Sequence, residues 1–122
     1  MFVMKLAFVF RSTPFGRAST REGLDALLAA TAFCDEQDIA VFFLDDGVFS
    51  LLNHQDPAQI LQKDVVNMFK LLDLYDIKQR YICLESLATA KMTASDCIIT
   101  CEKMARAALL TLLGKAERVL TF

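Results

Sequence analysis

The fold of this chain is decided by two apolar segments, LAFVF at residues 6–10 and IAVFFL at residues 39–44. An unbroken apolar run of this length, without alternating polar residues, is typical of a strand that is buried on both faces. Between the two segments, apolar side chains recur at spacings of three and four residues, which predicts a helix over residues 20–33. A buried strand, a helix and a second buried strand form the repeating unit of a parallel sheet covered by helices.

The rest of the chain continues this alternation. Asp45, Asp46 and Gly47 predict a turn after the second strand, and Asp56 followed by Pro57 is typical of a helix start. The remaining expected elements are a helix over 64–74, a strand at 81–83, a short helix over 85–91, a strand over 97–100, a helix over 102–113 and a strand over 118–122. The pattern predicts one α/β domain, residues 1–122, with three α/β/α layers and a five-stranded, mostly parallel, flavodoxin-like sheet.

Length and composition limit the class of protein. A chain of 122 residues can bury one hydrophobic core without the help of disulfides or metals. Hydrophobic residues make up 55% of the chain and charged residues 23%, and the mean hydropathy is +0.39. These values exclude a disordered chain and suggest surplus apolar surface, which favours contact with a protein partner.

Charge and hydropathy also bear on partners and location. Thirteen basic and fifteen acidic residues give a net charge of -2 and a pI near 5.3, which disfavours direct binding to nucleic acid. No apolar stretch approaches the roughly 18 residues of a membrane helix, and the first ten residues do not form an export signal. We therefore expect a cytoplasmic protein that binds neither a membrane nor nucleic acid directly.

Cys83 is the first candidate for a reactive residue among four cysteines that form no C-x-x-C pattern. It is expected at the carboxyl end of the third strand, where reactive groups gather in parallel sheets, and directly before a helix that would favour a thiolate. Cys101 is the second candidate, expected between the fourth strand and the last helix, although neighbouring Glu102 opposes a thiolate there. The alternative for both is a buried packing role, which is also expected for Cys97, while Cys34 has no assigned role.

Other polar residues give weaker signals. His54 is the single histidine, which excludes a site built from several imidazoles, and it is expected in an exposed loop. Asp45 and Asp46 lack a third oxygen ligand at a suitable spacing, so no metal site is predicted. The loop at 11–21 carries three arginines that would hold an anion, but it has none of the glycine patterns that bind phosphate. No cofactor is therefore predicted.

The segment at 48–52 is unusually apolar for a connection, since it contains Val48, Phe49, Leu51 and Leu52. Loops normally lie at the surface, where such a density of apolar side chains is unusual unless another surface covers it. We interpret the segment as a contact with a partner. The alternative is that these side chains pack on the chain's own core.

Three longer segments carry a family resemblance. They read REGLDALLA at 21–29, AVFFLDDGVF at 40–49 and FKLLDLYDI at 69–77, and the ending RVLTF at 118–122 also fits. In this order and spacing, over nearly the whole chain, they resemble the C-type subunits of the DsrE/DsrF-like sulfur-relay family. The fold implied by this resemblance is the same three-layer α/β/α domain.

The resemblance also implies partners and a role. The C-type subunit would join related B-type and D-type subunits in a hetero-oligomer that passes persulfide sulfur from TusA towards TusE, for 2-thiolation of the wobble uridine in transfer RNA. The sulfur-carrying cysteine of that family belongs to the D-type subunit, and Cys83 stands at what looks like the matching position. Here Leu84, Glu85 and Ser86 follow it, in place of the run of small residues usual after the D-type cysteine.

Two main hypotheses therefore stand. In the first, the chain is a structural and docking subunit of a sulfurtransferase complex, not catalytic alone, with Cys83 as a candidate persulfide carrier. In the second, it is a flavodoxin-like module that binds an anion or a nucleotide at the loop at 11–21. An independent thiol oxidoreductase is disfavoured by the absence of C-x-x-C.

Overall fold

The computed structural model describes residues 4–13, 19–52 and 68–122, which form a five-stranded sheet in the order β4-β3-β2-β1-β5. Every adjacent pair of strands is parallel, so the prediction of an α/β fold is confirmed and the sheet is wholly parallel. The strands are β1 (Leu6–Phe10), β2 (Ile39–Phe43), β3 (Gln79–Cys83), β4 (Glu102–Met104) and β5 (Arg118–Thr121). In the described part of the chain, no helix has the length and apolar character needed to cross a membrane.

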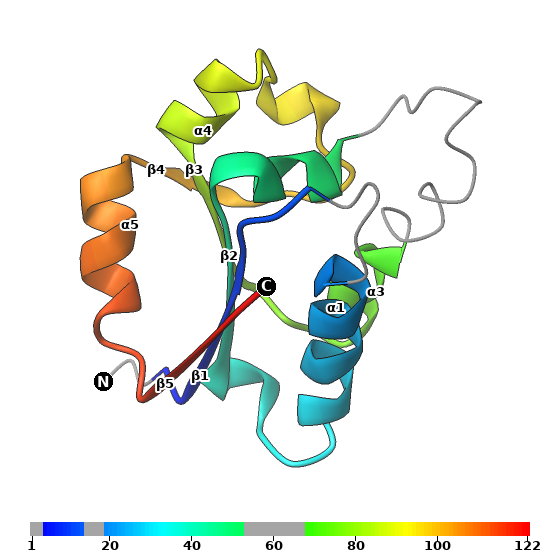
Figure 1. Cartoon of the computed structure of the whole chain (residues 1–122). Coiled ribbons are helices and arrows are strands. Elements are labelled where there is room, and N and C mark those ends of the chain that lie inside the picture. The colour runs from blue at the N-terminus through cyan, green and yellow to red at the C-terminus, as the bar shows by residue number, and fades with distance from the viewer. Residues whose placement is uncertain (1–3, 14–18, 53–67) are drawn as a thin grey trace.

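Helices lie on both faces of the sheet, as the three-layer prediction requires (Figure 1). The α-helices are α1 (Ser19–Ala30), α3 (Leu71–Leu74), α4 (Leu84–Thr89) and α5 (Arg106–Leu113), and the 3-10 helices are η1 (Glu36–Asp38), η2 (Asp45–Leu51) and η4 (Ala94–Asp96). Helices α1 and α3 cover one face, α5 covers the other, and α4 lies beyond the carboxyl end of β3. Crossovers between parallel strands are right-handed, so the reversal of direction from β4 back to β5 places α5 on the opposite face.

The core has two halves because side chains alternate along each strand. The half beside α1 and α3 contains Phe8, Phe10, Val41, Phe43 and Ile82 from the strands. The half beside α5 contains Ala7, Val9, Ala40, Phe42, Tyr81 and Cys83 from the same strands. All five residues of β2 are buried. The unbroken apolar runs of β1 and β2 are therefore explained by burial on both faces of the sheet, as predicted from the sequence.

Four aromatic rings pack together in the larger half of the core. The ring of Phe10 lies 5.6 Å from that of Phe43, 5.2 Å from that of Phe69 and 5.9 Å from that of Phe122, measured between centroids. We call these four residues the aromatic cluster. Edge-to-face and offset packing at such separations adds to the stabilisation from burial alone.

Near the fourth strand, one predicted element is wrong and another begins later than predicted. The segment at 97–100 is irregular, and the fourth strand is β4, which begins at Glu102. The apolar character of 97–100 has another cause, since Ile99 is buried in the core while the Ile98 N–H donates to the Leu51 carbonyl at 2.8 Å. The helix predicted from 102 begins at Arg106, because 102–104 pair with β3 as a charged edge strand.

The other boundaries agree more closely. The short helix predicted over 85–91 is α4, and the strand predicted at 81–83 is the carboxyl-terminal part of β3. Of the helix predicted over 64–74, the described part includes α3. Asp56, Pro57 and 64–67 lie outside the described residues.

The apolar segment at 48–52 packs on the chain's own core. Val48 and Leu51 are fully buried, and Phe49 and Leu52 are partly buried against the same core residues. The interpretation of this segment as a partner contact is therefore wrong, and its alternative is confirmed. The segment is apolar because η2 covers the carboxyl-terminal end of the sheet.

Candidate functional site

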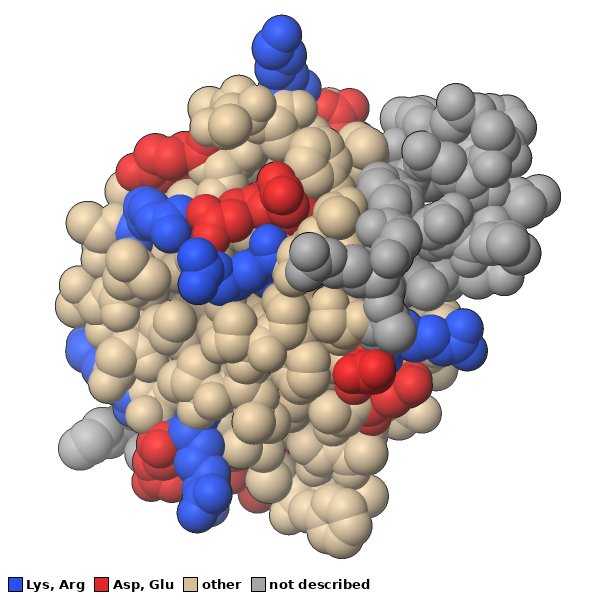
Figure 2. All heavy atoms as spheres, viewed as in Figure 1, with Lys and Arg blue, Asp and Glu red and all other residues tan. Residues whose placement is uncertain are grey.

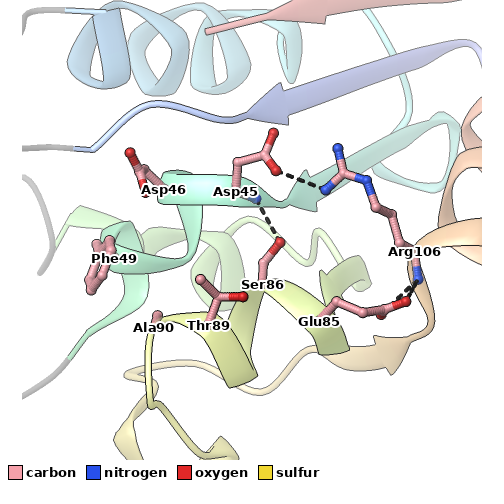
Figure 3. Close-up of a pocket in the computed structure, with 8 residues that line it drawn as sticks. All are labelled: Asp45, Asp46, Phe49, Glu85, Ser86, Thr89, Ala90 and Arg106. Carbon is pink, nitrogen blue, oxygen red and sulfur yellow. Dashed lines mark hydrogen bonds and ion pairs between the residues drawn. The ribbon is translucent and has the colours of Figure 1, made fainter.

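A pocket of about 330 Å³ lies at the carboxyl ends of the strands, where η2, α4 and the start of α5 meet (Figure 3). Its lining consists of Asp45, Asp46, Phe49, Glu85, Ser86, Thr89, Ala90 and Arg106. Figure 2 shows acidic and basic side chains side by side in the upper part of the viewed face, above a broad uncharged area. This end of the sheet is where parallel α/β folds place their ligands and reactive groups.

Asp45 is the centre of the charged network at this end. Its carboxylate accepts hydrogen bonds from Nη1 of Arg106 at 2.8 Å and from Nε of Arg11 at 2.9 Å. Its backbone N–H donates to Oγ of Ser86 at 2.8 Å. Asp45 has a φ of 52°, a left-handed conformation that aspartate tolerates better than most residues. The predicted turn after the second strand therefore contains the residue, Asp45, whose contacts connect the ends of β1 and β2 to the first residue of α5.

The two arginines stabilise the ionised form of Asp45. Hydrogen bonding to Arg106, the largest influence, lowers the pKa of the Asp45 carboxyl below its usual value, against a smaller opposing effect of burial. The same hydrogen bond raises the pKa of the Arg106 guanidinium, with a further contribution from the Cys83 thiol. Both side chains therefore remain charged at neutral pH.

The lowered pKa of Asp45 predicts a pH-dependent contribution to stability. Its ion pairs stabilise the folded state above the unfolded pKa of about 4, and this contribution is lost as the pH falls through the lower folded pKa. We therefore expect Asp45→Asn to be less stable than the wild type at pH 7, and the difference to shrink as the pH falls below about 4. Urea denaturation of both proteins at a series of pH values measures this. A difference that stays constant down to pH 2 would contradict it.

Cys83 occupies the predicted position, at the carboxyl end of β3 and directly before α4. Its side chain is fully buried, in the half of the core beside α5. The Cys83 Sγ lies 3.9 Å from Oε1 of Glu85, and the Glu85 carboxylate accepts the backbone N–H of Arg106 at 2.9 and 3.1 Å. The thiol therefore lies beside a carboxylate that also binds the backbone of the first residue of α5.

Cys101 does not lie where the sequence predicts. It precedes β4 and does not open the last helix, so it has no helix start beside it. It lines a second pocket, of about 240 Å³, together with Cys97. Burial raises the pKa of Cys101 to about 12 and also raises that of Cys97. Both side chains are thus neutral thiols at physiological pH, which agrees with the packing role that was their alternative.

The other candidate site residues from the sequence lie partly outside the part of the chain that the structure describes. His54 lies outside the described residues, as do 14–18 of the arginine-rich loop. Among the residues that the structure describes, no three His, Cys, Asp or Glu side chains gather in a way that could hold a metal ion. Arg11, the first arginine of that loop, is paired with Asp45 through both Nε and Nη2, so its charge is already neutralised.

Sequence reasoning missed two residues of this site. The sequence pattern places Arg106 only within a predicted helix and assigns no role to Ser86. A local signal existed for Arg106 in retrospect, because a basic side chain at the start of a helix is electrostatically unfavourable unless an acidic partner compensates it.

Comparisons with known proteins agree with this architecture. The family model for the DsrE/DsrF-like family matches residues 4–122. The protein named "Protein TusC homolog" from Pasteurella multocida (strain Pm70) is 99% identical over 119 residues, which is 98% of this chain and 100% of the relative. The TusC homolog of Haemophilus influenzae is 52% identical over the same shares, and "Protein TusC" of Escherichia coli O157:H7 is 55% identical over 68% of each chain.

A solved structure shares the fold at much lower identity. The crystal structure of the ychN protein from E. coli has a TM-score of 0.77 and 20% sequence identity, over 98% of this chain and 100% of the other. This likeness supports the arrangement of the sheet and its helices. The family model and the relatives together establish identity at the level of the family: this chain belongs to the DsrE/DsrF-like family and is a homolog of TusC.

Proposed function

We propose that this chain, residues 1–122 as one domain, is the C-type subunit of a cytoplasmic TusBCD-type sulfur-relay complex. In this complex it serves mainly to dock the related B-type and D-type subunits, and the sulfur passes from TusA towards TusE for 2-thiolation of the wobble uridine. The proposal is supported by 99% identity to a TusC homolog over 119 residues. The chain alone is not expected to act as an enzyme.

The geometry around Cys83 argues against a main role of this chain as the sulfur carrier. A persulfide carrier must attack the outer sulfur of an incoming persulfide with its thiolate, so that a new S–S bond forms while the old S–S bond breaks and the donor leaves as a thiolate. That attack needs a thiol that the donor can reach. Cys83 is fully buried and lies beside the Glu85 carboxylate. We therefore assign it a secondary part in transfer, dependent on exposure within the complex.

Co-expression tests the docking role. The chain, produced together with the B-type and D-type subunits of the same organism, should elute with both as one hetero-oligomer in size-exclusion chromatography. Cys83→Ser should assemble equally well, because docking does not use the thiol. If the wild-type chain remains monomeric while both other subunits are present and folded, the proposal fails.

Mass spectrometry tests the secondary part of Cys83. The assembled complex is incubated with a persulfide donor, and the peptide that contains Cys83 should gain the mass of one sulfur atom in the wild type. The Cys83→Ser chain should gain none, and Cys34→Ser serves as the matched control. A wild-type chain that gains no sulfur, or a Cys83→Ser chain that gains as much, would exclude Cys83 as a carrier while leaving the docking role intact.

A further inference from the structure

Cys97 and Cys101 line the same pocket of about 240 Å³, and both pack against the half of the core beside α1 and α3. Both are free thiols and are partly exposed. Every residue from 97 to 101 lines this pocket, so the segment curves around it. A pocket this small brings the residues at the two ends of the segment near each other. The two cysteines are therefore neighbours in space as well as in sequence.

The path of the backbone between the two cysteines supports this arrangement. An extended chain would separate Cα atoms four residues apart by about 13 Å, beyond the limit of about 7 Å for a disulfide. Here the chain bends at both Ile98 and Ile99, so residues 97 and 101 lie closer than an extended chain would allow. Burial is the main cause of the raised pKa of Cys101, and the Cys97 thiol adds to it, an electrostatic influence that weakens with distance.

The pocket also gives the two thiols room to meet. Ile99 is buried in the core, and the Ile98 N–H donates to the Leu51 carbonyl at 2.8 Å, so the middle of the segment is held in place. The Sγ of Cys97 donates only to the Thr93 carbonyl, at 3.8 Å, and a thiol is a weak donor. Joining the two sulfur atoms therefore requires rotation of two side chains into the pocket, with the core left in place.

We propose that Cys97 and Cys101 form a redox-sensitive pair, which closes to an intramolecular disulfide when the protein meets a small-molecule disulfide such as oxidised glutathione. One cysteine attacks the oxidant as its thiolate, so that a mixed disulfide forms and the first glutathione leaves as a thiolate. The second cysteine attacks the protein sulfur of that mixed disulfide, and the second glutathione leaves. The two thiol protons end on the two glutathione molecules, so the pair is oxidised and the oxidant is reduced.

The disulfide fixes the segment that connects η2 with β4. Cys97 forms a backbone bridge with Leu52, and β4 begins directly after Cys101. Figure 1 shows this segment passing beside η2 on its way to β4. Because both thiols are neutral at pH 7, their exchange is slow compared with that of a catalytic pair, which suits a response to lasting oxidising conditions. The inference does not depend on the proposed function, since Cys83 takes no part in it.

Incubation of the full, folded chain with oxidised glutathione tests the pair. Free thiols are then alkylated under denaturing conditions, and peptide mapping by mass spectrometry assigns the state of each cysteine. In the wild type, Cys97 and Cys101 should together lose two hydrogen atoms and take up no label. With reduced glutathione kept at ~0.1 mM, this disulfide should exceed the glutathione adducts of the two cysteines by about tenfold, because a thiol on a short linker acts at a millimolar effective concentration.

Serine variants supply the matched controls. Cys97→Ser and Cys101→Ser should each keep a glutathione adduct on the remaining cysteine, because no second thiol displaces it. Cys34→Ser, which removes another partly exposed thiol, should form the disulfide as the wild type does. Phenylarsine oxide, which binds two nearby thiols with loss of water, gives a second measurement without an oxidant. The wild type should bind it through Cys97 and Cys101, and the two single variants of the pair should not.

Three results would overturn the proposal. Glutathione adducts on Cys97 and Cys101 without a disulfide would show that the two sulfur atoms cannot meet. Two cysteines that react neither with glutathione nor with the arsenical would show that the pair does not respond to its surroundings. Disulfides of Cys101 with Cys34 or Cys83 in equal yield would show that exchange requires unfolding of the chain. All three results are read from the wild type, so they remain decisive even if a serine variant fails to fold.

Discussion

Gly47→Ala is expected to destabilise the protein by about 3 kcal/mol or more. A Cβ atom at position 47 would lie 1.7 Å from the carbonyl oxygen of Phe10 and 2.3 Å from its carbonyl carbon. The clash is with backbone, so no change of side-chain rotamer relieves it. The same carbonyl oxygen accepts the Leu44 N–H at 3.1 Å, so movement of this backbone would also disturb the junction of β1 and β2.

Gly114→Ala is the matched control for this prediction. A Cβ at position 114 would meet its nearest neighbour, the Thr111 carbonyl oxygen, at 3.5 Å, an ordinary contact. Its effect should lie within about 1 kcal/mol of zero, since alanine fits this conformation and restricts the unfolded chain. Urea denaturation of the three proteins measures both effects. Equal stabilities for the two variants would show that position 47 of η2 has room for a Cβ beside the Phe10 carbonyl group.

Phe10→Ala is expected to reduce the free energy of unfolding by about 3 to 5 kcal/mol, a large part of the total stability of a domain this size. Phe10 is fully buried and lies at the centre of the aromatic cluster, in contact with the rings of Phe43, Phe69 and Phe122. Removal of its ring leaves a cavity that rigid neighbouring rings cannot fill by small movements. Thermal or urea unfolding, followed by circular dichroism, gives the change.

Phe33→Ala is the control that separates burial from residue type. The side chain of Phe33 is 88% exposed, so its loss should change the free energy of unfolding by no more than about 0.5 kcal/mol. A Phe10→Ala effect below about 1 kcal/mol would contradict the packing of the aromatic cluster. A Phe33→Ala effect as large as that of Phe10→Ala would instead show that Phe33 is covered in solution.

The parts of the fold that were predictable from the sequence are those decided by local pattern. Strands β1 and β2 are buried on both faces, so their apolar runs identify them without knowledge of their neighbours. Strand β4 is a three-residue edge strand with two charged residues, Glu102 and Lys103, and it has no such signal. The apolar residues just before it belong to an irregular segment whose burial comes from tertiary packing, which local pattern cannot distinguish from a strand.

For the site, too, only the features that follow from local sequence pattern were predictable. Cys83 could be placed at a strand end because it closes the short apolar run at 81–83, and the carboxyl end of a strand is a general location for reactive groups. The pairing of Asp45 with Arg106 joins residues 61 positions apart and depends on the order of the strands. Because the apolar patterns do not give that order, the pairing could not be predicted, whereas the burial of Cys83 agrees with the packing role that the sequence offered as its alternative.

The position of β5 has a consequence for biosynthesis. Strand β1 lies between β2 and β5, and Leu6 pairs with Arg118. One edge of β1 therefore stays unpaired until the ribosome has made a segment that lies more than a hundred residues later in the chain. Contacts between such distant segments form late in folding. Until then, the nascent chain exposes an apolar strand edge that another unfolded molecule can extend. Slow translation of the last segment should therefore promote aggregation of this chain, and chaperones that shield strand edges should counteract it.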